Sequence, residues 1–216
     1  MFSIFLDFIF PPRCPSCSAY VERRGAFCAA CMRRLSMPHV LVRTAEMIAV
    51  LDGVWAFAHY REGVRDLLRG LKYQKRRSVL PALHSLLAAG DEFLAALPHP
   101  LVAVPVPLAP KRRKERGFNQ SEEIFAPWLR QHEIPIAPLL VRIRETAPLY
   151  EQTRTQRRRE LHGAFAVAKD AEVTGADILL VDDIMTTGAT LTECARTLKR
   201  AGAGRIYAFV LASEHM

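Results

Sequence analysis

One short segment constrains the fold more than any other feature of the chain. Residues 178–181 are apolar and lie between acids, the pattern of a strand buried on both faces of a parallel sheet. Asp182 and Asp183 follow at its carboxyl end, where open α/β sheets place their ligands. Small residues and Gly188 then lead into a helix predicted over residues 190–201. Because N–H groups and the dipole at a helix start bind phosphate, the segment predicts a phosphate-ligand site.

The residue types in this segment indicate the chemistry of that ligand. Carboxylate oxygens accept hydrogen bonds from sugar hydroxyls, whereas threonine hydroxyls and backbone N–H groups donate to a phosphate ester. A ribose 5-phosphate carries both groups, about one sugar ring apart. A chance acidic turn after an apolar strand is the alternative, but the pattern extends over residues 178–191, and it lacks the Gly-Lys-Ser/Thr ending of a P-loop. The predicted ligand-binding residues of the loop are Met185, Thr186, Thr187, Gly188, Ala189 and Thr190.

Strand and helix patterns alternate through most of the chain, which predicts an α/β fold with a mostly parallel sheet flanked by helices. Ser121 is the expected N-cap of one helix, residues 111–117 are expected to form a basic loop, and residues 142–162 are expected to be mostly loop. Strands are predicted over residues 53–60, 101–106, 163–167, 178–181 and 205–211, with a short one within 134–141, and helices over 62–71, 79–97, 121–132 and 190–201.

Four of the five cysteines form two Cys-x-x-Cys pairs, Cys14 with Cys17 and Cys28 with Cys31. Each pair can turn two thiolates toward one tetrahedral ion, and four thiolates leave no open coordination position. We therefore predict structural zinc, with a redox pair or unrelated thiols as the alternatives. Cys194 lies on the apolar face of the last predicted helix and is expected in the core.

The length of 216 residues suits one domain with a small appendage. We predict a cysteine-containing segment and linker over residues 1–48 and the main domain over residues 49–216. The apolar residues 1–10 contain Asp7 and stop at Pro11, well short of the ~20 residues of a membrane span. They also lack the features of a secretory signal. We expect this opening to pack on the body of a cytoplasmic protein with no membrane span.

The net charge of +8, from 30 Lys and Arg against 22 Asp and Glu, favours a phosphate-bearing partner. Three basic stretches, residues 72–77, 111–116 and 154–159, favour a polyanion, although each alone is typical of a solvated surface. Lys72 is predicted to reach a bound diphosphate. The second stretch continues into an aromatic residue and two amides, groups that suit stacking and hydrogen bonding to bases. The predicted nucleic-acid contacts are Lys111, Arg112, Arg113, Lys114, Arg116, Phe118, Asn119 and Gln120.

Residues 178–191 resemble the phosphoribosyl-diphosphate signature of type I phosphoribosyltransferases. The resemblance implies that Asp182 and Asp183 hold the ribose 2′ and 3′ hydroxyls and act as the catalytic residues. It implies that residues 186–190 cradle the 5′-phosphate and that magnesium accompanies the diphosphate. The family often has a second glycine where this chain has Ala189, and the small alanine is expected to do little harm.

An ordered set of motifs along the chain resembles the ComF family, whose members are phosphoribosyltransferase-like proteins linked to bacterial DNA uptake. The resemblance implies single-stranded DNA and other DNA-uptake proteins as partners. Two departures are the lack of further cysteines in residues 37–51 and Glu160 where the family often has asparagine. The motifs are Phe-Pro-Pro-Arg-Cys14 with the cysteine pairs, Leu-Lys72-Tyr, Val104-Pro-Val-Pro107, Arg116-Gly-Phe-Asn-Gln-Ser121, Gly163-Ala-Phe165 and Asp182-Asp183.

Three functional hypotheses remain open at the level of the sequence. The first is a DNA-uptake factor that binds single-stranded DNA and phosphoribosyl diphosphate. The second is an active phosphoribosyltransferase acting on an unidentified nitrogen acceptor in nucleotide metabolism. The third is a non-catalytic sensor of phosphoribosyl diphosphate. No residue stands out as a dedicated general base, and Asp183 qualifies by its position alone.

Overall fold

A five-stranded sheet forms the centre of the computed structural model, which describes residues 10–145 and 154–214. The strand order is β1-β2-β7-β6-β3; β1 is antiparallel to β2, and the other neighbouring pairs are parallel. The prediction of a mostly parallel α/β sheet is therefore confirmed. The strands of this sheet are β1 (Ser36–Val40), β2 (Gly53–His59), β3 (Val102–Pro105), β6 (Ile178–Met185) and β7 (Ile206–Ser213), and a separate antiparallel pair consists of β4 (Leu140–Arg142) and β5 (Phe165–Val167).

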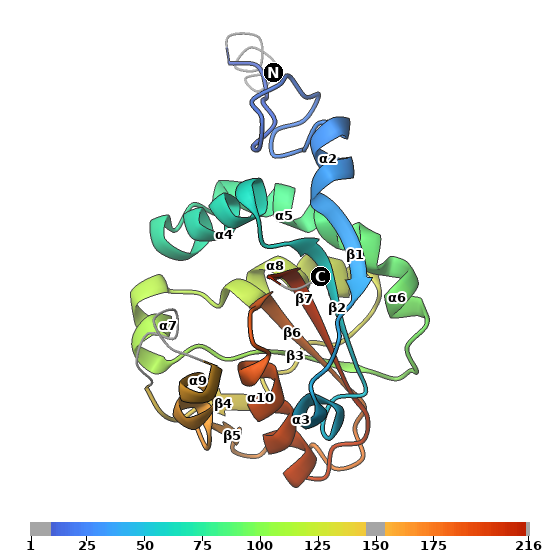
Figure 1. The fold of residues 1–216 in the computed structure, drawn as a ribbon, viewed down its shortest axis with the longest axis vertical. Helices are drawn as coiled ribbons and strands as arrows, with labels where there is room; N and C mark the ends of the chain where they lie inside the picture. Colours follow the sequence, from blue (N-terminus) through green and yellow to red (C-terminus); the bar gives the residue numbers. More distant parts are fainter. Residues whose placement is uncertain (1–9, 146–153, 215–216) are drawn as a thin grey trace.

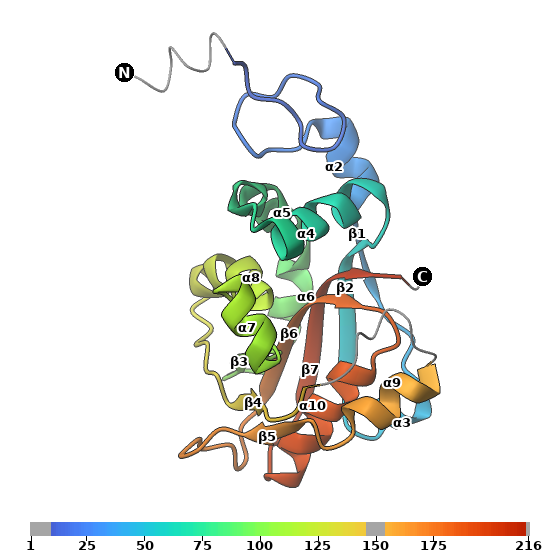
Figure 2. The ribbon, with the colours of Figure 1, turned by 90° about the vertical axis from the view of Figure 1, so that its left-hand side faces the viewer.

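Helices cover both faces of the sheet, as two views at right angles show (Figures 1 and 2). One face is covered by α4 (Glu62–Gln74), α5 (Leu80–Leu87), α6 (Asp91–Ala95) and α8 (Gln120–Gln131). The other is covered by α10 (Ala189–Arg200), with α3 (Ala45–Ile48) beside it. The helical pattern over residues 79–97 follows a short 3₁₀ turn, Arg77–Val79, and is divided by a second one, Ala88–Gly90.

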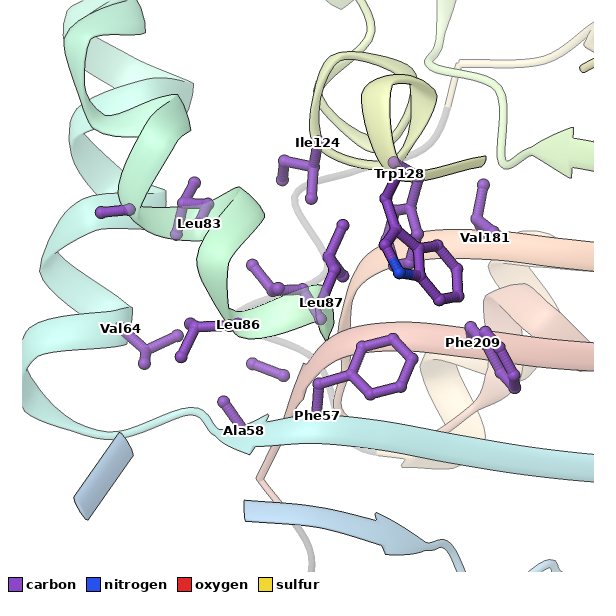
Figure 3. Packing of buried hydrophobic residues seen from close by; sticks show 14 of the residues in the cluster. Phe57, Ala58, Val64, Leu83, Leu86, Leu87, Ile124, Trp128, Val181 and Phe209 are labelled. Carbon is purple, nitrogen blue, oxygen red and sulfur yellow. The ribbon is translucent and has the colours of Figure 1, made fainter. Parts of the chain in front are cut away.

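Aromatic side chains join the first helical layer to the sheet (Figure 3). The ring of Phe57 on β2 meets Phe209 on β7 edge to face, with centroids 5.2 Å apart, and lies 6.0 Å from Trp128 of α8. Edge-to-face pairs add to the hydrophobic stabilisation of a core. Leu86 and Leu87 of α5 are fully buried in the same cluster. This layer fixes α4, α5 and α8 against the strands that carry the site.

The second layer places α10 directly behind the strand that carries the two acids. Leu191 and Leu198 of α10 pack with Leu180 of β6 and Val210 of β7. Cys194 is fully buried in this cluster, which confirms it as a core residue.

Two segments predicted as loops contain helices, α7 (Pro110–Arg116) and α9 (Arg154–Leu161). Pro110 begins α7, a position proline favours, and Gly117 ends it with a φ of +81°. Both helices consist largely of charged residues with good helix propensity, so they lack the apolar period by which a helix is recognised.

The N-cap of α8 also differs from the prediction. Asn119, not Ser121, caps the helix, because its side-chain oxygen accepts a hydrogen bond from the Ser121 N–H at 3.1 Å. Ser121 is thereby left free to use its hydroxyl elsewhere, and it lies inside the helix with no exposed surface.

The N-terminal segment (residues 10–35) lies beyond α4 and α5 in both views and ends in α2 (Ala29–Leu35) (Figures 1 and 2). It packs closely on those helices: a Cβ at Gly25 would lie 2.8 Å from Pro81, and one at Gly63 would lie 2.7 Å from Ser16. The chain then enters β1, so part of the predicted linker is the edge strand of the main sheet. The boundary at residues 48 and 49 stays a prediction, and residues 1–9 of the apolar opening lie outside the described residues.

No helix among the described residues combines the length and the apolar character that a membrane crossing requires.

Candidate functional site

Asp182 and Asp183 stand near the carboxyl end of β6. Before the acids, Leu179 and Val181 pack with the first helical layer and Leu180 packs with the α10 layer. Beyond them the alternation is reversed, since Ile184 packs with the first layer and Met185 with the second. Both acids are buried, Asp182 to 9% and Asp183 to 4% exposure. They meet different partners.

Asp183 forms an ion pair with Lys72 from the last turn of α4, through its Oδ2 atom. The side chains are 5% and 16% exposed, so the pair is largely removed from water. Burial lowers the pKa of the Arg116 guanidinium, and the charge of Asp183 opposes that shift. The predicted Lys72 is thus brought to this carboxylate from α4.

Asp182 is held by the start of α8. Its Oδ1 atom accepts hydrogen bonds from the Ser121 hydroxyl at 2.9 Å and from the Asp183 N–H at 2.9 Å. Burial, together with the charge of Asp183, raises the pKa of the Asp182 carboxyl to about 8, while Lys72 and the Ser121 hydrogen bond oppose the rise. The role of Ser121 is a finding of the structure, because the sequence assigned it to capping.

The phosphate loop (residues 185–190) connects β6 to α10 and depends on glycine at one position. Gly188 is the N-cap of α10 with a φ of +74°, a left-handed conformation that suits glycine. A Cβ there would lie 2.8 Å from the sulfur of Met47 on α3, so the space is also closed. The loop residues, with Asp182, enclose a hollow of about 40 Å³.

A larger cavity of about 680 Å³ adjoins the phosphate loop through Thr187 and Ala189. Arginines of α9 and α10 line it, among them Arg159 and Arg196. The arrangement combines backbone donors at a helix start, threonine hydroxyls and nearby cations, which together suit an anionic phosphate ester.

The predicted nucleic-acid residues divide into two groups. Lys111, Arg113 and Lys114 are exposed on α7, and Arg112 and Arg116 are half-buried, so these cations are available to a polyanion. Phe118, Asn119 and Gln120 are each 5% exposed and serve the turn between α7 and α8. This burial does not fit the prediction that they contact bases.

The partners of these three residues explain their burial. The Arg77 guanidinium covers the Phe118 ring at 4.7 Å. The Asn119 amide donates to the Val106 carbonyl at 3.0 Å, and Gln120 accepts a hydrogen bond from Arg116 at 2.6 Å. The motif therefore holds α8, and with it Ser121, in place beside Asp182.

Glu193 is a further buried acid that the sequence did not single out. It is 3% exposed on α10, accepts a hydrogen bond from the Gly163 N–H at 2.8 Å and forms an ion pair with Arg196. It thereby ties the turn between α9 and β5 to the helix behind the phosphate loop. A helix face that is otherwise apolar gives no signal that an acid will be buried in it.

Cys14, Cys17, Cys28 and Cys31 form one cluster in which all four sulfur atoms lie within 4.8 Å of one another. A tetrahedral zinc ion with Zn–S bonds of about 2.3 Å needs sulfurs about 3.8 Å apart, so the geometry fits. In the described part of the chain, no other group of three or more potential ligand side chains is close enough to hold a metal. The cluster supports structural zinc rather than a disulfide, since all four cysteines are free.

Without a metal ion, the cysteines of the cluster compete for protons. Burial raises the pKa of the Cys14 thiol, but backbone N–H groups at Cys28, Cys17 and Ser16 outweigh it and lower the pKa to about 6. The Ala19 N–H lowers the pKa of Cys17, yet contacts with the neighbouring cysteines raise it to about 12. Four clustered thiols cannot all lose their protons unless a metal ion compensates the charge.

Comparisons with known proteins agree with both parts of this structure. Residues 5–40 match the double zinc ribbon domain, and residues 120–215 match the phosphoribosyl transferase domain. The chain is 30% identical to the DNA utilization protein YhgH of Salmonella typhi, covering 92% of this chain and 88% of that protein. It is 27% identical to competence protein F of Haemophilus influenzae, covering 93% and 84%, and 27% identical to competence protein ComFC of Bacillus subtilis, covering 92% and 82%.

These relatives match over nearly their whole length, and both conserved parts occur in the expected order. An N-terminal cysteine cluster suited to zinc precedes a mostly parallel phosphoribosyltransferase sheet. The chain belongs to the ComF family.

Proposed function

We propose that this protein binds phosphoribosyl diphosphate with magnesium at the phosphate loop and handles single-stranded DNA during DNA uptake. The observation that carries the first part is the convergence of Asp183, Lys72 and the Gly188 turn at the end of one buried strand. The names of the relatives, DNA utilization protein and competence protein, support the second part.

Each part of the ligand has a matching group in the proposed site. The N–H groups of residues 186–190 and the hydroxyls of Thr186, Thr187 and Thr190 would hold the 5′-phosphate. The two buried carboxylates would accept hydrogen bonds from the ribose hydroxyls. Lys72 lies beside Asp183 and would contact the diphosphate.

Magnesium would enter with the diphosphate rather than occupy a site built by protein alone. Asp182 and Asp183 offer hard oxygen ligands, but no third acid lies close enough in the described residues to complete a cation site. Magnesium ordinarily takes one or two carboxylates and fills its remaining positions with phosphates and water. When bound, it would neutralise charge on the departing diphosphate.

Transfer of the ribosyl group would require pyrophosphate to leave the anomeric carbon as positive charge develops on the ring. The Asp183 carboxylate would stabilise that charge electrostatically. The Asp182 carboxyl, with a pKa of about 8, is suited to exchange a proton near neutral pH. An active transferase is therefore the second candidate function, with the nitrogen acceptor unidentified.

Calorimetry of phosphoribosyl diphosphate with magnesium tests the site. We expect Asp182→Asn with Asp183→Asn to abolish binding while circular dichroism shows an intact fold. Asp177→Asn is the matched control: Asp177 precedes the same strand at its opposite end, where it binds Arg205. Equal affinity in the double variant and the parent protein would refute the site.

Pyrophosphate release separates the functional candidates. The parent protein is incubated with phosphoribosyl diphosphate and magnesium, with and without a single-stranded oligonucleotide. Oligonucleotide binding without release supports a DNA-handling protein, and release supports a transferase. Ligand binding with neither result would leave a sensor of phosphoribosyl diphosphate and refute the proposed role in DNA handling.

A further inference from the structure

A row of basic residues follows one face of α4 and ends at the candidate site. Arg61, Arg65 and Arg69 are spaced four residues apart and Lys72 follows three residues later, so all four lie on one side of the helix. The three arginines are exposed, while Val64, Leu67, Leu68 and Leu71 bury the opposite side. We call these four cations the α4 basic face.

We propose that the α4 basic face, together with the exposed ring of Tyr73, is a binding track that leads a nucleic-acid single strand to Asp183. This inference rests on the proposed role in DNA handling and assigns it a surface. Four helical residues span about 6 Å, comparable to the distance between successive phosphates of an extended single strand. One strand can therefore place consecutive phosphates beside consecutive arginines.

The track runs from the N-terminal segment to the candidate site. At the carboxyl end, Lys72 contacts Asp183. Arg69 lies one helical turn before Lys72 on the same side of α4. At the amino end, Gly63 packs against Ser16 of the N-terminal segment. Helix α4 lies between that segment and the strands in both views (Figures 1 and 2).

Tyr73 supplies an aromatic surface that Phe118 does not. Its side chain is 70% exposed at the end of α4, whereas Phe118 is 5% exposed beneath Arg77. The Arg116 guanidinium lies 5.8 Å from the Tyr73 ring centre, so a cation and a flat ring are presented together. This pairing is typical of sites that hold single strands by phosphate contact and base stacking.

Lys72 is paired with Asp183, but the three arginines of this face are poorly compensated by the protein itself. Among the side chains that the structure describes, Arg61 and Arg69 have no acidic partner within ion-pair distance. Arg65 meets Asp66 at 3.7 Å, at the exposed surface, where such pairs contribute little. Further exposed cations lie on α7, the helix that ends at Arg116 beside Tyr73. A nucleic-acid single strand can use both the row of cations and the exposed Tyr73 ring, whereas an acidic protein patch would use the cations alone.

The charge contribution is tested by Arg61→Gln with Arg65→Gln and Arg69→Gln. The matched control removes three exposed cations elsewhere, by Arg130→Gln with Lys169→Gln and Arg200→Gln. Binding of a labelled oligothymidine is followed by fluorescence anisotropy at several salt concentrations. Each lost phosphate contact lowers the salt slope of a single strand by about 0.7, so the α4 variant should lose about 2 and the control variant nothing.

The stacking contribution is tested by Tyr73→Ala, with Tyr73→Phe as the control that keeps the ring. Loss of one stacked base should weaken single-strand binding roughly ten-fold in the alanine variant only. A duplex of the same length, whose bases are already stacked, should bind both variants equally. An effect of Tyr73→Ala on duplex and single strand alike would overturn the stacking role.

Failure of this inference can be distinguished from failure of the proposed function. Phosphoribosyl diphosphate binding, measured on the same preparations, should be unchanged in the α4 and Tyr73 variants. Parent-like oligonucleotide binding by the α4 variant would overturn the track and leave the DNA role standing. A parent protein that binds no oligonucleotide would overturn both, whatever the ligand result.

Discussion

The cysteine cluster and the phosphate loop are the two proposed ligand sites, but the chain builds them over very different sequence distances. All four cysteines lie between Cys14 and Cys31, so one short stretch supplies every metal ligand. The phosphate site combines the β6–α10 connection with Lys72 from α4 and Ser121 from α8. The first site therefore depends on its ion, and the second depends on the packed sheet that brings distant elements together.

This difference predicts opposite responses to perturbation. Structural zinc provides about 10–16 kcal/mol of binding free energy that is linked to local folding. The phosphate loop draws its order from two hydrophobic layers, including Phe57, Phe209 and Leu180. Removing the metal should thus affect one region, and altering the packing behind the loop should affect the other.

The largest expected effect is the loss of the N-terminal segment without zinc. Cys14→Ser, or a strong chelator, should release the ion and abolish hydrogen-exchange protection in residues 10–35, because three thiolates bind zinc far more weakly than four. The parent protein should contain one zinc per chain by metal analysis. The sheet and the phosphoribosyl diphosphate affinity should change little.

Cys194→Ser is the matched control for the zinc prediction. This cysteine is fully buried behind the phosphate loop and lies outside the cysteine cluster. The control should keep its zinc and lose about 1–3 kcal/mol of global stability, because it buries a hydroxyl in an apolar core. A purified parent protein without zinc would contradict the prediction that the N-terminal segment depends on a bound ion.

A smaller effect is expected when the turn of the phosphate loop is forced away from glycine. Gly188→Ala combines a strained φ of +74° with a Cβ 2.8 Å from the Met47 sulfur, so we expect a loss of about 2–4 kcal/mol. Phosphoribosyl diphosphate affinity should fall with it, and calorimetry and urea unfolding measure the two effects.

Gly175→Ala measures the cost of the left-handed backbone conformation without a steric contact. Gly175 has a similar φ of +72°, but a Cβ there meets nothing within 4 Å. We expect a loss of about 1 kcal/mol from the backbone conformation alone. Equal losses in the two variants would show that contact with α3 does not shape the loop.

The contrast between the two sites also explains how far the sequence could predict them. The cysteine ligands and the strand, loop and helix over residues 178–191 were predicted from local patterns, and the structure contains these elements. The Ser121 contact with Asp182 was missed because it joins residues far apart in the chain. The helices α7 and α9 were missed because helices rich in charged residues have no apolar period.

Lys72 marks the boundary between these two kinds of prediction. Its position at the end of a helical pattern predicted a contact with diphosphate, and the structure pairs it with Asp183. Phe118 shows the reverse case. Its neighbours suggested base stacking, but the residue fills the turn before α8. A basic aromatic motif does not reveal whether its ring faces solvent or core, since both uses have the same composition.

The smallest expected effect is the contribution of the Asp182 carboxyl to the pH dependence of the protein's stability. Its pKa is raised from 3.8 to about 8, mainly by burial and the charge of Asp183. Above pH 4 the unfolded chain releases a proton that the folded protein keeps. The contribution of Asp182 to the free energy of unfolding is therefore greatest at low pH and declines as the pH rises. It levels off above pH 8, where the folded carboxyl also ionises.

Asp182→Asn removes this titration while its amide oxygen can still accept the Ser121 hydroxyl. The stability of the variant relative to the parent should thus rise by about 1–2 kcal/mol between pH 6 and pH 8, within the limit of about 1.4 kcal/mol per pH unit for one proton. Urea unfolding at several pH values measures this difference, and Asp177→Asn should show no such trend. Parallel pH profiles for parent and Asp182→Asn would mean that water or a bound cation reaches the carboxylate in the folded protein. The phosphate site would then be accessible to water or ions in the absence of its ligand. The site would then depend less on the packed sheet than the buried contacts of Asp182 indicate.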